Sequence, residues 1–390
     1  MPKDRKRVLI ATGWYDYRLH RGLEKYALEH NWHLNANLTR GRVIPWAWHG
    51  DGILTSLAGG DDLAEFVIRA NKPTVDFSFR RPHLKFPRVL EDHAHAATLV
   101  AEHFLARGFT NFIFYSNEEN WAYEERGRGF VAALQQAGQE CGWIRWHQSP
   151  DYQAELPDYD ADKKQSQRHR KWLAASLKKA RKPLALFAAN DAHALDVLDA
   201  CENAGIAVPE QVAIVGADDY LLAPDAMPIP ISSVDTNLEM LGYRGAALLD
   251  DLMNGKKPPA NPVRVPAVGV VVRKSSDLLA VRHPGVAKSL QYIARHFQQP
   301  VALADLAKVA AMSRRGLHKA FLEHLGRNPG EELQRFRIER AKQLLAANDR
   351  KIEDVASQCG YQSANSFYLA FKQATGRSPT EFRNSCAKQT

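Results

Sequence analysis

The chain has 390 residues, of which 45% are hydrophobic and 25% charged, a balance typical of globular proteins and a length that suits two or three domains. This composition excludes a disordered or fibrous chain. No window holds the ~18 uninterrupted apolar residues of a membrane span. The basic start at residues 2–7 runs into an apolar stretch that is too short and too polar for a signal segment. We therefore expect a cytoplasmic protein with no membrane partner.

The pattern of cysteines argues against a fold that depends on disulfide bonds or on a bound metal. The four cysteines are scattered and form no CxxC pair, so we expect free thiols. His93 and His95 form a possible metal pair, but no third ligand is near them in the sequence. We expect no metal and no cofactor.

The net charge of +8 is concentrated at one end of the chain. Residues 285–390 hold 17 Lys and Arg against 9 Asp and Glu, whereas the first 284 residues hold 35 of each. A neutral body with a basic tail indicates that the tail contacts a polyanion, and nucleic acid is the most plausible one.

The body alternates short apolar runs with amphipathic stretches, which predicts βαβ units with mostly parallel sheets. About 270 residues are many for one sheet, so we expect two α/β lobes. The predicted strands are Val8–Thr12, Gly52–Ser56, Thr74–Phe77, Asn111–Ser116, Leu184–Ala189, Gln211–Ala217 and Val268–Val272. The predicted helices between them include Ala94–Ala106, Glu125–Ala137 and Ala192–Ala204.

The tail is entirely helical in pattern and contains an internal repeat. We expect a sensor domain over 1–275, a linker over 276–287 and a DNA-binding domain over 288–390. The pattern Ala-Phe, Gly-Arg, Pro and Glu that begins at Ala320 recurs 50 residues later at Ala370. Two copies of one supersecondary unit explain this recurrence.

Each copy predicts a helix-turn-helix, whose second helix enters the major groove of DNA. The predicted helices are Leu303–Ala311 and Ser313–His324 in the first copy, Ile352–Cys359 and Ala364–Thr375 in the second, with Gly330–Ala347 between them. Ser313 and Ser363 are placed as N-caps. The predicted DNA-binding residues are Ser313, Arg314, Arg315, His318, Lys319, Ser363, Asn365, Ser366 and Tyr368. The apolar positions Leu317, Phe321, Leu322, Phe367 and Phe371 are expected in the core.

Two runs of the tail, Arg337–Leu345 and Ser366–Arg383, resemble the signature of the arabinose-regulator (AraC/XylS) family. The resemblance covers about the last 100 residues. It implies sequence-specific DNA binding and transcriptional activation. Ala364-Asn365 departs from the acidic residue and Gln common in that family, so no operator preference is carried over.

Polar and aromatic side chains follow several predicted strands of the body. In open α/β folds, ligands lie beyond the carboxyl ends of the parallel strands. The candidates there are Trp14, Tyr15, Asp16, Asn190, Asp191 and Asp218. Carboxylates and amides suit sugar hydroxyls, and flat rings suit the C–H faces of a sugar. Turn and cap residues are the alternative interpretation, because Asp and Asn are common in turns.

The segments Asn190-Asp191, Val212–Asp219 and Ile231–Asp235 resemble the sensor domain of the lactose/galactose repressors, which has a periplasmic-binding-protein fold. That resemblance implies an effector cleft lined by Asn190, Asp218 and Arg126. Only seven residues precede the first predicted strand, so we expect the DNA reader at the C-terminal end. The combination of this sensor with an AraC-type tail resembles the family of bacterial xylose operon regulators.

These observations and resemblances predict a sugar-responsive transcription regulator that binds double-stranded operator DNA and activates xylose or other pentose catabolic genes. The resemblance implies a homodimer and, if the protein is an activator, contact with RNA polymerase. The sequence lacks GxSxG, HExxH, GxxxxGK[ST] and GxGxxG motifs, so we expect no enzyme. Three alternatives stay open: an enzyme acting on a sugar with an appended DNA reader, a repressor that responds to another small polar effector, and a sugar-binding module whose tail does not bind DNA.

Overall fold

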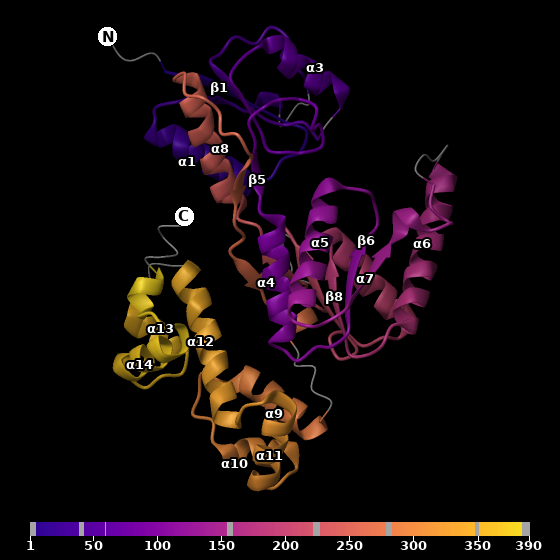
Figure 1. Cartoon of the computed structure of the whole chain (residues 1–390), viewed down its shortest axis with the longest axis vertical. Coiled ribbons are helices and arrows are strands. Elements are labelled where there is room, and N and C mark those ends of the chain that lie inside the picture. Colours follow the sequence, from indigo (N-terminus) through magenta and orange to yellow (C-terminus); the bar gives the residue numbers. More distant parts are fainter. Residues whose placement is uncertain are drawn as a thin grey trace. The chain divides into compact units, whose positions relative to one another are not determined.

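The computed structural model describes residues 5–38, 43–58, 60–153, 159–220, 227–277, 283–347 and 351–383. The chain divides into two compact units, one formed by residues 1–105 and 110–277 and the other by residues 278–390 with the short segment 106–109. Figure 1 shows both units. In the described part of the chain, no helix is long and apolar enough to span a membrane.

The first unit contains the two α/β lobes that the sequence predicts. The sheet of the first lobe is entirely parallel and has the strand order β2 (His33–Asn35), β1 (Arg7–Thr12), β3 (Gly52–Ser56) and β4 (Thr74–Asp76). The sheet of the second lobe has the order β12 (Gly269–Val271), β10 (Ser232–Asp235), β9 (Val212–Ala217), β8 (Leu184–Ala188), β6 (Phe112–Ser116) and β7 (Cys141–Arg145). Among its described strands, β10 and β12 pair antiparallel and the other pairs are parallel.

The helices of the first unit complete the two layers around each sheet. They are α1 (Tyr17–Glu29), α3 (Asp61–Ala70), α4 (His93–Leu105), α5 (Trp121–Gln136), α6 (Tyr159–Lys179), α7 (Asp191–Ala204) and α8 (Leu238–Met253). The last of these, α8, follows a strand of the second lobe yet packs beside α1 of the first lobe (Figure 1). Gly22 and Gly242 permit this close approach, because a Cβ at either position would lie within 2.2 Å of the facing helix backbone.

The lobes are joined by more than one crossing of the chain. Strand β5 (Val89–Glu91) pairs in parallel with β11 (Val263–Val265) in a separate two-stranded ladder. Arg264 of β11 donates two hydrogen bonds, of 2.8 and 2.9 Å, to the carboxylate of Glu125 in α5. This contact holds β11, and β5 paired with it, against α5 of the second lobe.

The second unit consists of helices in its described part: α9 (Pro284–His296), α10 (Leu303–Ala310), α11 (Arg314–Leu325), α12 (Pro329–Ala347), α13 (Ile352–Gln358) and α14 (Ala364–Thr375). One apolar core lies among α9, α10, α11 and the start of α12, and a second lies among the end of α12, α13 and α14. The predicted repeat corresponds to this pair of cores.

The repeated sequence has a structural cause at the helix starts. Asn328 and Glu331 form a reciprocal capping box, in which each side chain accepts a hydrogen bond from the backbone N–H of the other. Ser378 and Glu381 do the same in the second copy, at 3.2 and 2.7 Å. Such boxes satisfy N–H groups that a helix start leaves unpaired.

Several sequence expectations need correction. The short strands β2, β5, β7, β10 and β11 were not predicted, because three to five residues carry too little alternation to stand out. Helix α9 begins at Pro284, inside the predicted linker of 276–287, whose residues 278–282 lie outside the described residues. Cys141, Cys201 and Cys359 are free thiols, and Cys386 lies outside the described residues.

Candidate functional site

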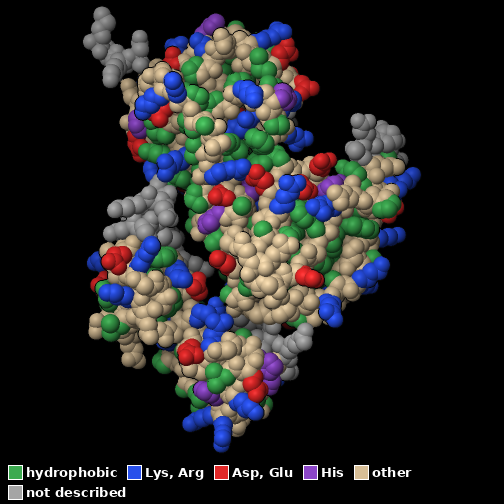
Figure 2. Space-filling view, in the orientation of Figure 1, with side chains coloured by type: hydrophobic (Ala, Val, Ile, Leu, Met, Phe, Trp, Pro, Cys, Tyr) green, Lys and Arg blue, Asp and Glu red, His purple; other side chains and the backbone are tan. Residues whose placement is uncertain are grey.

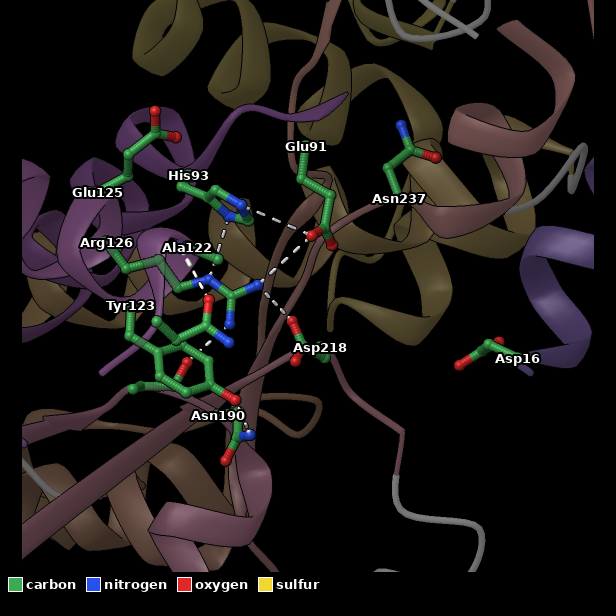
Figure 3. A network of polar contacts seen from close by, with 12 residues as sticks. Asp16, Glu91, His93, Ala122, Tyr123, Glu125, Arg126, Asn190, Asp218 and Asn237 are labelled. Atoms are coloured by element: carbon green, nitrogen blue, oxygen red, sulfur yellow. Dashed lines mark hydrogen bonds and ion pairs between the residues drawn. The ribbon is translucent and has the colours of Figure 1, made fainter. Parts of the chain in front are cut away.

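Arg126 is the centre of a polar network beyond the strand ends of the second lobe (Figure 3). It lies in the second turn of α5 and is only 2% exposed. Its Nη2 donates a 2.5 Å hydrogen bond to Asp218, and its Nη1 donates a 2.6 Å bond to the carbonyl oxygen of Ala189. Burial opposes the charge, but Asp218 and Glu91 raise the pKa of Arg126 further, so the guanidinium stays protonated.

Glu91, the last residue of β5, and His93, the first residue of α4, complete this network. Glu91 Oε2 lies 3.6 Å from Arg126 Nη2 and 3.8 Å from His93 Nε2. Burial and the negative charge of Asp218 raise the pKa of Glu91 to about 7, against the opposing effect of Arg126. Burial lowers the pKa of His93 well below its usual value, so the ring is neutral. His93 Nδ1 accepts a hydrogen bond from Arg126 Nε at 3.2 Å, which places the ring proton on Nε2, facing Glu91.

Asn190 is fixed from both sides. It is the N-cap of α7, where its Oδ1 accepts a hydrogen bond from the backbone N–H of His193 at 2.8 Å. Its Nδ2 donates to the hydroxyl of Tyr123 at 2.8 Å. Burial raises the pKa of Tyr123, so this phenol keeps its proton across the physiological range. Figure 3 shows Tyr123 and Asn190 on the same side of Arg126.

Asp218 and Asp219 follow β9 with unusual backbone angles and diverging side chains. Their φ angles are +90° and +49°, values that residues other than glycine adopt at an energetic cost and that cluster at functional sites. Asp218 bonds to Arg126, whereas Asp219 accepts a 2.7 Å hydrogen bond from Arg273. The side chain of Asp218 is still 27% exposed, so it combines a fixed position with an open face.

The first lobe contributes aromatic rings and a second arginine. Trp14 is fixed by a 2.8 Å hydrogen bond from its Nε1 to Ser56 Oγ at the end of β3, and Tyr15 is 55% exposed. Asp16 caps α1 and binds the guanidinium of Arg18. Arg18 Nη1 in turn donates to the carbonyl oxygens of Asp218 and Asp219, at 2.8 and 3.0 Å. Arg18 therefore links the two lobes beside the network of Arg126.

Asp191, another predicted ligand contact, takes a structural position instead. It is fully buried, and its two oxygens accept hydrogen bonds from Ser233 Oγ at 2.5 Å and from the backbone N–H of Tyr220 at 3.0 Å. Burial raises its pKa to about 7. We therefore leave Asp191 out of the candidate contact set. Of the remaining predicted residues, Trp14, Tyr15, Asp16, Asn190 and Asp218 follow strands of the two lobes, and Arg126 lies in the second turn of α5.

Glu91 and Tyr123 belong to this site but were not predicted from the sequence. Tyr123 had a usable signal, because it precedes Arg126 by three residues and therefore shares its helix face. Glu91 had none, since β5 is too short to predict. His93 was considered only as a metal ligand; in the described residues no group of three or more His, Cys, Asp or Glu side chains is placed to hold a metal ion.

The second unit presents two exposed helix surfaces. Ser313 and Ser363 are N-caps, as predicted, and accept hydrogen bonds from the backbone N–H groups of Gly316 and Ser366 at 3.0 and 3.1 Å. The predicted contact residues that follow them in α11 and α14 are all exposed: Arg314, Arg315, His318, Lys319, Asn365, Ser366 and Tyr368. Donors and acceptors of this kind suit base edges and phosphates.

The apolar side of these helices agrees with the prediction except at one position. Leu317, Phe321, Phe367 and Phe371 are fully buried. Leu322 was expected in the core but is 46% exposed. Its neighbour Phe321 already fills the buried stripe of α11, and the next residue points away from it.

The two helix-turn-helix copies are joined by a set of specific contacts around α12. Arg337 of α12 donates hydrogen bonds to the carbonyl oxygens of Phe297 and Gln299, at 2.8 and 3.0 Å, just after α9. Its guanidinium also lies 5.5 Å from the ring centre of Tyr361, in the turn of the second copy. Gly360 packs against the backbone of Phe297, where no larger residue would fit. The two exposed helices are thus fixed relative to one another.

Comparison with known proteins agrees with this architecture. Residues 101–276 match a periplasmic binding protein-like domain, and residues 306–385 match a helix-turn-helix domain. The chain is 28% identical over 309 residues to the xylose operon regulatory protein of Haemophilus influenzae, covering 78% of this chain and 76% of that protein. It is 30% identical over 199 residues to the protein of the same name from Escherichia coli, a match that spans only 51% of each chain.

A solved structure shows the same order of domains. The structure of a xylose-binding transcription activator, XylR, covers 99% of both chains with a TM-score of 0.58 at 22% identity. At this identity the likeness establishes the fold alone, a periplasmic-binding-protein-like domain followed by a helical domain. Both of these sequence relatives carry the name of regulatory proteins.

Proposed function

We propose that this homologue of the xylose operon regulatory proteins, a periplasmic binding protein-like domain followed by an AraC-type helix-turn-helix domain, activates pentose catabolic genes when xylose or a similar sugar binds between its lobes. The observation that carries the proposal is the convergence of Asp218, Asn190 and Arg126 beyond the strand ends of the second lobe, where Arg18, four residues after the exposed Trp14, reaches the backbone of Asp218 from the first lobe. Fixed acceptors and flat rings together suit a small polyhydroxylated ligand.

The burial of Arg126 defines its role within this site. Because it is 2% exposed and bonded to Asp218, it positions the carboxylate that meets the ligand. Asp218 and Asn190 then accept and donate hydrogen bonds to sugar hydroxyls, and Trp14 and Tyr15 cover the C–H face. A preformed arrangement of this kind reduces the ordering cost of binding.

Ligand binding changes DNA engagement by favouring the closed arrangement of the lobes. A ligand shifts such an equilibrium only through its different affinity for the two states. Arg18 is placed to report closure, since it bonds to the backbone carbonyls of Asp218 and Asp219 across the lobes. The protein acts in the cytoplasm as a homodimer, which gains avidity from two tethered DNA readers, and contacts RNA polymerase as an activator.

Calorimetric titration of the full chain with D-xylose, L-arabinose, D-ribose and D-glucose tests the effector proposal. We expect tight binding of one pentose, weakened about tenfold to a hundredfold in Asp218→Asn, because a hydrogen bond to a charged group contributes about 1.5–3 kcal/mol. Asp219→Asn is the matched control, since its carboxylate bonds to Arg273 and faces away from Arg126. Equal affinities of Asp218→Asn and wild type would refute the assignment of Asp218. No heat with any sugar would point to another small polar effector.

A further inference from the structure

Helix α6 carries an unusual concentration of positive charge for a sensor domain. Residues 159–182 contain nine Lys and Arg against two Asp. Residues 159–182 therefore carry a net charge of +7. Since residues 1–284 hold equal numbers of acidic and basic side chains, the rest of residues 1–284 carries −7. The charge is therefore separated on the surface of one domain, although the domain as a whole is neutral.

The cations of α6 form a continuous stripe. At 100° per residue, Lys164, Arg168, Lys171 and Lys178 fall on one side of the helix, opposite the fully buried Leu173 and Leu177. All four are exposed, and none of their side chains has an ion pair or hydrogen bond with a described residue. In Figure 2, blue side chains line the edge of the molecule where α6 lies in Figure 1.

A second copy of the chain is a poor partner for this stripe. In a two-fold dimer the same patch meets itself across the axis, and rows of like charge facing each other are repulsive. A partner with its own regular negative charge is needed to match a row of unpaired cations. Duplex DNA has that property, with one negative charge per ~1.7 Å of its axis.

We propose that the stripe formed by Lys164, Arg168, Lys171 and Lys178 binds the phosphate backbone of duplex DNA that flanks the operator. This inference rests on the proposed function, because the helix-turn-helix domain must first bring DNA to the protein. Once the operator is bound, the flanking duplex is tethered, so weak contacts gain from a high effective concentration. Such contacts add affinity without reading base sequence.

The dimensions of the stripe fit this role. Lys164 and Lys178 are 14 residues apart, which corresponds to about 21 Å along the helix axis. That length spans about 12 phosphate charges of a duplex. Each phosphate contact adds about −0.9 to the slope of log affinity against log salt concentration. Loss of four contacts therefore reduces the slope by about 3 to 4.

The test uses the full chain and DNA that the wild-type protein selects from a randomised pool. The selected site is placed either in a short duplex just long enough for both readers or at the centre of a long duplex with added flanks. The stripe variant combines K164Q, R168Q, K171Q and K178Q. The control variant combines K72Q, R80Q, K85Q and K257Q, four exposed cations elsewhere on the same unit.

We expect wild type and control to bind the long duplex at least tenfold more tightly than the short one, with a steeper salt dependence. The stripe variant should bind the short duplex normally and lose the gain from the flanks. Equal long-to-short ratios for wild type and stripe variant would overturn the proposal, as would an equal loss in the control variant. If wild type selected no DNA and failed to bind the short duplex, the proposed function itself would be wrong.

Discussion

Substitution of Gly360 by alanine tests whether the joint between the two helix-turn-helix copies is as tight as the structure indicates. Gly360 ends the first helix of the second copy with φ +78°. A Cβ at this position would lie 2.4 Å from the carbonyl oxygen of Phe297 and 2.9 Å from the Cα of Gln298. Both are backbone atoms of the first copy, so the clash is relieved only by moving one copy away from the other.

The first copy supplies an internal reference for the size of the effect. Its equivalent position is Ala311, which adopts φ +53°. The left-handed conformation costs a residue other than glycine about 1–2 kcal/mol, and overpacking adds about 1–3 kcal/mol. We therefore expect G360A to destabilise the second unit by about 2–5 kcal/mol. The reciprocal change, A311G, relieves strain without creating a clash and should leave stability unchanged or raise it by up to about 1 kcal/mol.

The position of the tryptophans allows the two units to be followed separately in the intact protein. All eight lie between Trp14 and Trp172, so tryptophan fluorescence during urea unfolding reports on the first unit alone. Far-ultraviolet circular dichroism reports on the helices of both. G360A should lower the urea midpoint of the second unit, which contributes to the dichroism signal but not to the fluorescence signal. It should also weaken binding to duplexes that engage both readers. A G360A protein as stable as wild type in both signals would refute the close contact with Phe297.

Three further predictions concern single side chains. R18Q should weaken effector binding about tenfold, because two hydrogen bonds to the carbonyl oxygens of Asp218 and Asp219 across the lobes are lost. Titration calorimetry measures the affinity, and an unchanged value would contradict a role of Arg18 in closure. The pKa of Asp191 is raised to about 7, so its carboxyl binds a proton more readily in the folded state; its contribution to stability is present below about pH 4 and is lost as the pH rises to about 7. D191N should remove that decline. If the free energy of unfolding in urea fell equally with rising pH in D191N and wild type, the raised pKa of Asp191 would be refuted. R314A should cost about 1–3 kcal/mol on the preferred site if Arg314 reads a base, whereas equal weakening on all duplexes would assign it to a phosphate.

The sequence predicted the long, strongly patterned elements well and the short ones poorly. Strand Gly52–Ser56 and helix Ala364–Thr375 have the predicted bounds, because an uninterrupted apolar run or a full amphipathic period defines them. Strand β5 has only three residues, and its pairing with β11 joins segments more than 170 residues apart. Such a pairing depends on tertiary structure and leaves no local signal.

The candidate site shows the same division. Asn190 and Asp218 could be predicted because both directly follow buried strands. Asp191 was misplaced because adjacent residues at a helix start point in different directions, one outward and one into the domain. Two partners of Arg126, Glu91 and His93, could not be predicted, since they reach it only after the chain has crossed between the lobes.

Helix α12 sets the spacing between α11 and α14 independently of the side chains that these two helices expose. The side chains of α11 and α14 that we propose to face DNA are exposed and largely unpacked, so sequence preference can drift one substitution at a time. The spacing between α11 and α14 cannot drift in this way, because one residue inserted into α12 would turn the second copy by about 100° and displace it by about 1.5 Å. Arg337 could then no longer bond to Phe297 and Gln299 on one side while lying over the ring of Tyr361 on the other. Descendants of this chain should therefore recognise diverse operator sequences with one conserved half-site distance.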